Sequence, residues 1–171
     1  MYRKQIPSGE DPKYERSACE ARSRIYLNGK VDHMLSIKRA DETDDRIGEF
    51  IDREFTAFAT ESEVALNYED FIFVAEEDGE LVGVLTGRAY YNEVHIGDLI
   101  IKSGHRRGGI GKMLVEEVEK TYSGRGYEKL ALTTFGFQAP GFYGKLGFKT
   151  EFVREDKDPK LKKYFLIKAL K

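Results

Sequence analysis

The chain after residue 34 carries two hydrophobic periodicities, one typical of strands and one typical of helices. Runs rich in β-branched and aromatic residues predict strands over 35–39, 71–76, 81–88, 94–101, 129–134, 148–154 and 164–170. Apolar residues spaced three and four apart predict helices over about 44–59, 110–123 and 139–146. Glu77-Asp78-Gly79 is typical of a hairpin turn. This order predicts an α+β fold with a mixed sheet and helices on its faces.

Residues 1–33 differ in pattern from the rest of the chain. Apolar side chains there fall on one face of a possible helix, ended by Asn28-Gly29; they are Tyr14, Ala18, Ala21 and Ile25. We therefore expect 1–33 to form a partly helical N-terminal extension and 34–171 to form the main domain. Such an extension could pack on the domain or on a second subunit, which would make the protein a homodimer.

Length and composition narrow the class of protein. A chain of 171 residues suits one domain with a core of its own. Cys19 is the only cysteine, so an intrachain disulfide is excluded and a reducing compartment is favoured. No apolar stretch approaches the roughly 20 residues of a membrane span, and the N-terminus has no hydrophobic signal core. We expect a cytoplasmic protein with no membrane partner.

Charge is distributed unevenly along the chain. The total of −2 argues against a general nucleic-acid binder. Residues 1–39 carry +4, residues 40–98 carry −14 and residues 99–171 carry +8. This asymmetry indicates an anion bound by the late part of the chain and a cation met by the acidic middle. An acidic segment that is simply solvated explains the middle equally well.

A basic, glycine-rich turn separates the apolar run Leu99-Ile100-Ile101 from the helix predicted after it. This order directs free backbone N–H groups and a positive helix end at one point, which is a way of holding phosphate. It is not a P-loop, because Arg106 and Met113 replace the required glycine and hydroxyl residue. It is not a dinucleotide fingerprint either, because Leu114 replaces the third glycine.

The turn has the pattern Arg-x-x-Gly-x-Gly at Arg106, Gly109 and Gly111, and a second segment follows at Gln138–Phe148. In both segments the chain resembles the GCN5-related N-acetyltransferases (GNAT). The resemblance implies a mixed, mostly antiparallel sheet flanked by helices. It also implies acetyl-coenzyme A as co-substrate. We expect no metal site, since no histidine has a nearby histidine or cysteine partner in the sequence.

The resemblance implies a set of coenzyme-binding residues. Amides of 107–112 would donate to the diphosphate, and the N–H of Ile100 or Ile101 would polarise the thioester carbonyl. Gln138 stands where the family more usually has asparagine. The implied set is Leu99, Ile100, Ile101, Arg106, Arg107, Gly108, Gly109, Ile110, Gly111, Lys112, Gln138, Phe142, Tyr143 and Lys145.

Catalysis needs a proton acceptor for the amine and a donor for the leaving thiolate. Tyr143 stands where the family has its general acid, although a packing aromatic beside Phe142 fits the same position. Family members commonly use a strand carboxylate as base through water, so Glu93 and Asp98 are candidates, and His95 titrates in a useful range. On a regular strand Glu93 and His95 share a face and Asp98 points the other way. An ordinary surface role is as compatible with each of the three.

The function expected from these features is acetyl transfer from acetyl-coenzyme A to a primary amine, by direct attack in a ternary complex. The acceptor would be a small molecule, peptide or protein, without nucleic acid. The acidic middle and its aromatics are compatible with a cationic acceptor; these aromatics are Phe55, Phe58, Tyr68, Tyr90 and Tyr91. Two alternatives are transfer of another acyl group or to an amino acid, and a non-catalytic coenzyme A sensor.

Overall fold

The computed structural model describes residues 21–27, 30–40 and 44–171. The chain divides into two units, one ending at Phe55 and the other spanning Thr56–Lys171. In the first unit β1 (Ala21–Leu27) and β2 (Lys30–Ile37) form an antiparallel two-stranded sheet, and α1 (Asp45–Glu61) begins. The Asp44 carboxylate accepts the Arg46 N–H at 3.2 Å and caps α1. The domain boundary expected between 33 and 34 stays a prediction.

The helix expected over 14–25 is wrong in its described part. Ala21–Leu27 form a strand, and 14–20 lie outside the described residues. The sequence explains the error, because Asn-Gly is the signal of a two-residue hairpin loop as well as a helix stop. The residues beside it, Ile25, Tyr26 and Val31, are of types that favour strands. The short strand expected over 35–39 is the end of β2, which stops at Ile37.

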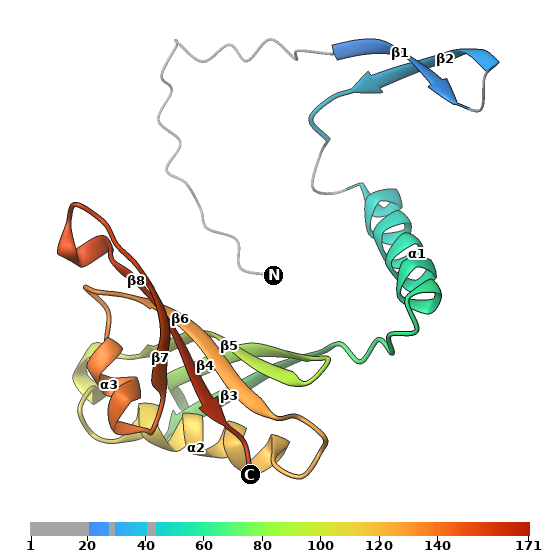
Figure 1. The fold of residues 1–171 in the computed structure, drawn as a ribbon. Coiled ribbons are helices and arrows are strands. Elements are labelled where there is room, and N and C mark those ends of the chain that lie inside the picture. The colour runs from blue at the N-terminus through green and yellow to red at the C-terminus, as the bar shows by residue number, and fades with distance from the viewer. Residues whose placement is uncertain (1–20, 28–29, 41–43) are drawn as a thin grey trace. The chain divides into compact units, whose positions relative to one another are not determined.

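The second unit is built on a six-stranded sheet of order β3-β4-β5-β6-β8-β7 (Figure 1). Only β5 and β6 are parallel; the other neighbours are antiparallel, which confirms the predicted fold class. The strands are β3 (Glu69–Glu77), β4 (Glu80–Tyr90), β5 (Glu93–Ile101), β6 (Lys129–Phe135), β7 (Lys149–Arg154) and β8 (Lys163–Ala169). The helices are α2 (Ile110–Tyr122) and α3 (Pro140–Lys145), with 3₁₀ turns at Ser103–His105 and Pro159–Leu161.

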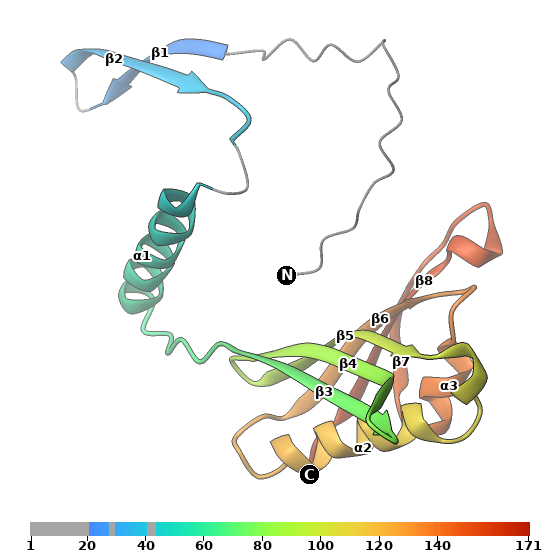
Figure 2. The same ribbon diagram turned by 180° about the vertical axis from the view of Figure 1, so that it is seen from behind.

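One face of the sheet forms the core, where α2 packs against β3, β4 and β5 (Figures 1 and 2). The helix buries Leu114, Val115, Val118 and Tyr122 on side chains such as Leu85 and Ile96. Two glycines of β4 lie where a side chain would have no room on this face. A Cβ at Gly87 would stand 2.3 Å from the Phe71 ring, and one at Gly83 would stand 3.1 Å from Ile110. The opposite face of the sheet, which carries Glu93, His95 and Lys129, is called the open face below.

Candidate functional site

The two parallel strands in the middle of the sheet separate along their length. β5 and β6 pair only from Glu93 to Ile96, against Lys129 to Leu132. Beyond this point a cavity of about 830 Å³ lies between the end of β5, the glycine turn and α3. Twelve of the fourteen expected coenzyme-binding residues line it, and Gly108 and Lys145 do not. The lining is Gly97, Asp98, Leu99, Ile100, Ile101, His105, Arg106, Arg107, Gly109, Ile110, Gly111, Lys112, Thr133, Thr134, Phe137, Gln138, Ala139, Phe142 and Tyr143.

A β-bulge in β5 determines which side chains reach the cavity. Leu85 pairs with Leu99 and Gly87 with Ile96, so two residues, Gly97 and Asp98, stand opposite Thr86 alone. The Thr86 hydroxyl accepts the Asp98 N–H at 3.1 Å. The extra residue shifts the alternation by one. Asp98 therefore lies on the open face together with Glu93 and His95, and the expectation that it points the other way is wrong.

The bulge also decides which backbone amides face the gap. The Lys102 N–H donates to the Val82 carbonyl on the β4 side at 2.9 Å. Because amides alternate along a strand, the N–H groups of Leu99 and Ile101 point away from β4, toward the gap. The Ile101 carbonyl, which points the same way, accepts the Arg106 Nε–H at 3.0 Å. Leu99 and Ile101, rather than Ile100, thus present donors to the cavity.

The glycine turn exposes the N-terminus of α2. Arg107 and Gly109 have left-handed backbone conformations, with φ of 68° and 90°. The first helical bond runs from the Met113 N–H to the Gly109 carbonyl at 3.0 Å, so the amides of 109–112 precede the helical ladder. A Cβ on Gly109 would meet nothing within 4 Å, and one on Gly111 would stand 3.3 Å from the Phe142 ring. The turn is an open cradle of backbone donors that fits a diphosphate.

The basic side chains of the turn divide into two groups. Arg106 donates its Nε–H to the Ile101 carbonyl, and His105 Nε2 lies 2.9 Å from a Glu77 carboxylate oxygen. Arg107 and Lys112 are exposed, and Lys112 has only a loose partner one helical turn away, Glu116 at 3.5 Å. Arg107 and Lys112 both line the cavity and can face an anion there. The Arg106 Nε–H links the turn to the end of β5.

Tyr143 reaches the same cavity from α3. Its ring makes edge contacts with Phe142 and Phe148, with centroids 5.0 Å and 5.7 Å away. The side chain is 8% exposed, and this burial raises the pKa of Tyr143 to about 12. The phenol therefore keeps its proton at neutral pH. Gln138 lines the same cavity, and its side-chain carbonyl accepts the Phe135 N–H at 2.7 Å and the Thr134 hydroxyl at 3.1 Å.

The three candidate bases do not share one environment. Asp98 lines the cavity together with Tyr143, and Glu93 and His95 do not. The half-buried Glu93 carboxylate accepts the Tyr90 hydroxyl at 3.2 Å and lies 3.6 Å from His95 Nδ1 and 3.7 Å from Lys129 Nζ. Glu93 and His95 thus belong to a polar cluster on the paired part of the strands.

Sequence reasoning missed several residues of the site. Thr86 supports the bulge, and Thr133, Thr134, Phe137 and Ala139 line the cavity. Only Ala139 carried a signal, as part of the second family segment. Within the part of the chain that the structure describes, no group of three or more His, Cys, Asp or Glu side chains is placed to hold a metal ion. None of its helices has the length and apolar character to cross a membrane.

Comparisons with known proteins agree with this geometry. The Acetyltransferase (GNAT) family model matches residues 34–148. A blasticidin-S acetyltransferase from Streptomyces morookaense is 30% identical over 99 residues, which cover 57% of this chain and 73% of that protein. A solved acetyltransferase from Bacillus cereus ATCC 14579 is 28% identical with a TM-score of 0.64, over 78% of this chain and 98% of the other.

The fold is also shared by an aminoglycoside 6'-N-acetyltransferase that was solved with coenzyme A. That likeness has a TM-score of 0.52 at 22% identity, over 60% of this chain and 73% of the other. The family match includes the glycine turn and the second motif, and both of these segments line the cavity. The resemblance drawn from the sequence is thereby confirmed: the chain belongs to the GNAT family of acetyl-CoA-dependent N-acetyltransferases.

Proposed function

We propose that this enzyme transfers the acetyl group of acetyl-coenzyme A directly to a primary amine, with both substrates bound at the gap between β5 and β6. The observation that carries the proposal is that Asp98, Tyr143 and the cradle of α2 amides line one cavity. A proton acceptor, a proton donor and an anion site are the three things that this reaction needs.

The diphosphate would be held by the amides of 109–112, aided by Arg107 and Lys112. The helix end adds a favourable field there, and the open space at Gly109 permits close approach. Bound acetyl-coenzyme A supplies an acetyl group activated as a thioester. The gap-facing N–H groups of Leu99 and Ile101 would stabilise the negative charge that develops on the carbonyl oxygen.

Asp98 is proposed as the base and Tyr143 as the acid. An amine with a pKa near ~10.4 reaches the site mainly as an ammonium ion, so it must lose a proton before nitrogen can attack. Asp98, directly or through water, would accept the ammonium proton, and the free amine would then attack the thioester carbon to form the C–N bond. The C–S bond would break as Tyr143 donates its proton to the departing sulfur, and the second proton lost by nitrogen would restore the Tyr143 hydroxyl. Glu93 is a weaker candidate because Tyr90, His95 and Lys129 already surround its carboxylate.

The relatives indicate a class of acceptor for this chain but no individual compound. The matched proteins include acetyltransferases named for blasticidin-S and for aminoglycosides, and we propose a small-molecule amine for this chain by analogy. A homodimer remains a prediction.

The decisive experiment is release of coenzyme A from acetyl-coenzyme A in the presence of a panel of primary amines. Transfer to at least one amine, with the N-acetyl product identified by mass spectrometry, is the expected result. Tight coenzyme binding by calorimetry with no release across the whole panel would instead indicate a sensor module. Faster release with propionyl- than with acetyl-coenzyme A would indicate a different acyl donor.

A further inference from the structure

A strip of aromatic and cationic side chains lies on the open face of the sheet, over β6, β8 and β7. We call it the aromatic–cationic strip; it consists of Phe135, Phe137, Phe152, Arg154, Lys163 and Phe165. Strand pairing brings its members together. Phe165 pairs with Phe152 on one side, and Lys163 pairs with Arg154 and with Phe135. Directly paired residues point to the same face, so these side chains form one surface.

The aromatic members present ring surface to solvent. Phe152 and Phe137 are 56% and 61% exposed, although each contacts another ring. The Phe152 and Phe165 centroids are 5.6 Å apart, and the Phe135 and Phe137 rings are nearly parallel with centroids 6.0 Å apart. Such rings offer faces and edges to a further planar group.

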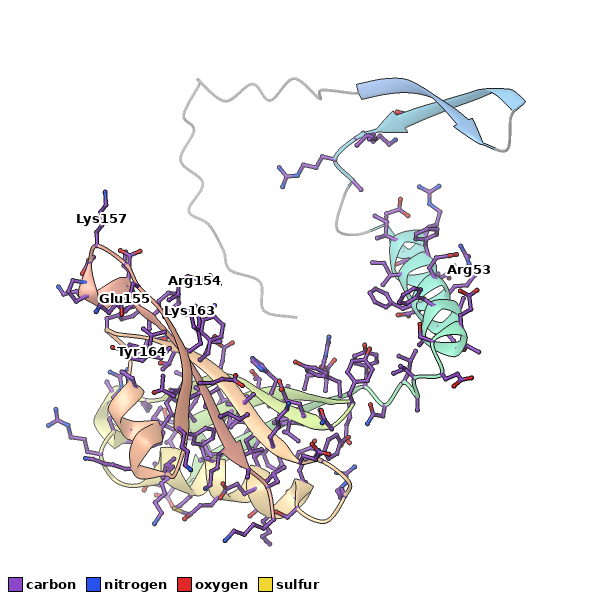
Figure 3. All side chains as sticks on the ribbon, viewed as in Figure 1. Arg53, Arg154, Glu155, Lys157, Lys163 and Tyr164 are labelled. Carbon is purple, nitrogen blue, oxygen red and sulfur yellow. The ribbon has the colours of Figure 1, made fainter. Side chains whose placement is uncertain are left out.

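The cationic members lie against these rings. The Arg154 guanidinium is 5.5 Å from the Phe165 centroid, and Lys163 Nζ is 5.5 Å from Phe165 and 5.6 Å from Phe135. Neither makes an ion pair with a carboxylate of the described residues, whereas the neighbouring Lys162 pairs with Glu155 at 2.7 Å. Figure 3 shows Arg154 and Lys163 close together beside β7 and β8. Two cations that lie on rings and have no carboxylate partner in the described part of the chain favour an anionic ligand.

The strip continues into the proposed active site. Phe137 lines the cavity, and so does Thr133, which pairs directly with Phe165. The loop between β7 and β8 is fastened to the cavity rim, because the Gly136 and Phe137 amides donate to the Lys162 and Lys160 carbonyls at 2.8 Å and 3.1 Å. Glu93 lies on the open face with Asp98, and it forms an ion pair with Lys129 of the neighbouring strand β6. Lys129 shares its face of β6 with Thr133 and Phe135, because side chains alternate along a strand. Asp98 and the strip therefore lie on the same face of the sheet.

The geometry points to the strip as the acceptor subsite, taking a planar aromatic or heteroaromatic ring that carries a carboxylate or phosphate group. This inference rests on the proposed function, since the amine of the same molecule must reach Asp98. Along β8, Lys163 lies one two-residue step, about 7 Å, beyond Phe165, which pairs with Thr133 at the cavity. A ring between the amine and the anion of an acceptor lets the amine stay at the cavity while the anion reaches toward Lys163. A polyamine would meet two uncompensated positive charges along this path.

Four primary amines test the inference with the full chain. They are 4-(aminomethyl)benzoate with ring and carboxylate, benzylamine with the ring alone, 6-aminohexanoate with the carboxylate alone, and cadaverine with neither. We expect kcat/KM for 4-(aminomethyl)benzoate to exceed that for cadaverine at least tenfold. Arg154→Gln and Lys163→Gln should each raise its KM about five- to tenfold, with KM for benzylamine and acetyl-coenzyme A unchanged.

Lys157→Gln is the matched control. Lys157 is an exposed lysine at the tip of the same loop, outside the strip (Figure 3), and its substitution should leave every constant unchanged. Binding of 4-(aminomethyl)benzoate, followed by NMR titration with coenzyme A present, should weaken in the same two strip variants and gives a readout independent of turnover.

The outcomes separate the two claims. If amines are acetylated but neither ring nor carboxylate changes kcat/KM, or both strip variants match the wild type, the strip is not the acceptor subsite and the proposed function stands. If coenzyme binds and no amine in a broad panel is acetylated, both claims fail. Binding of a thymidine dodecamer that the strip variants abolish and 4-(aminomethyl)benzoate does not displace would make the strip a nucleic-acid surface.

Discussion

Replacing Tyr143 by phenylalanine tests the proposed acid, because the change removes one hydroxyl and leaves the ring. The hydroxyl has no hydrogen-bond partner among the described residues, and the ring keeps its contacts with Phe142 and Phe148. A hydrogen bond to a group that becomes charged contributes about 1.5–3 kcal/mol. Losing that bond to the departing sulfur should lower kcat by roughly 10- to 150-fold.

The assay is steady-state coenzyme A release at saturating acetyl-coenzyme A, with coenzyme affinity measured by calorimetry. We expect kcat to fall and the coenzyme Kd to stay within about twofold, since the amide cradle is untouched. A Tyr143→Phe enzyme with the wild-type kcat would refute the acid role and leave Tyr143 as a packing aromatic between its two neighbours.

The same variant also tests the effect of burial on Tyr143. Raising its pKa from 10.0 to about 12 corresponds to about 2.7 kcal/mol in favour of the neutral phenol in the fold. Because the folded pKa is the higher one, this stability is present below pH 10 and is lost as pH rises toward 12. At pH 11 about 1.4 kcal/mol should be gone. Between pH 8 and pH 11, urea unfolding of the wild type should lose that much more stability than Tyr143→Phe. Equal losses would contradict the burial argument.

Three further changes probe the cradle, the base and the core. Gly109→Glu should weaken coenzyme binding at least about 100-fold by calorimetry, because it adds a negative charge at the turn. Gly109→Ala adds only backbone strain of about 1–2 kcal/mol and should weaken binding far less. Similar losses in the two variants would argue against an anion at this turn. Asp98→Asn should lower kcat by about 10²- to 10⁴-fold and Glu93→Gln by less than about threefold, and the reverse order would reassign the base. Gly87→Ala would place a methyl group 2.3 Å from the Phe71 ring. This overpacking should lower the free energy of unfolding by about 1–3 kcal/mol. An unchanged midpoint of urea unfolding would contradict the packing described.

Elements with strong periodicity were predictable from the sequence, and contacts between distant segments were not. The helix expected over 110–123 is α2, because its apolar stripe and its glycine boundaries agree. The β1–β2 hairpin was missed because Asn28-Gly29 fits two local structures and the choice depends on strand pairing. Arg106 was expected among the coenzyme-binding residues and lines the cavity; its Nε–H also binds the Ile101 carbonyl, and nothing in the local sequence indicates that contact.

The proposed coenzyme site has the clearest signal in the sequence because it consists largely of backbone. Glycines that permit an open turn leave a local pattern in the sequence, and Arg106, Gly109 and Gly111 form such a pattern. The base lacked a comparable pattern. Its assignment depends on how β5 pairs with β4, and the decisive partner, Thr86, lies on another strand and carries no motif.

The bulge in β5 connects the chemistry of the site to the energetics of the fold. Without the extra residue, alternation from Val94 and Ile96 would direct Asp98 and Ile100 into the core and expose both Leu99 and Ile101. Burying an unpaired carboxylate, with one apolar side chain packed on the core in place of two, would cost several kcal/mol. With the bulge, Leu99 and Ile101 pack against the core and Asp98 lies on the open face. The register that buries the apolar residues is therefore also the register that places Asp98, the proposed base, on the open face and backbone donors at the gap.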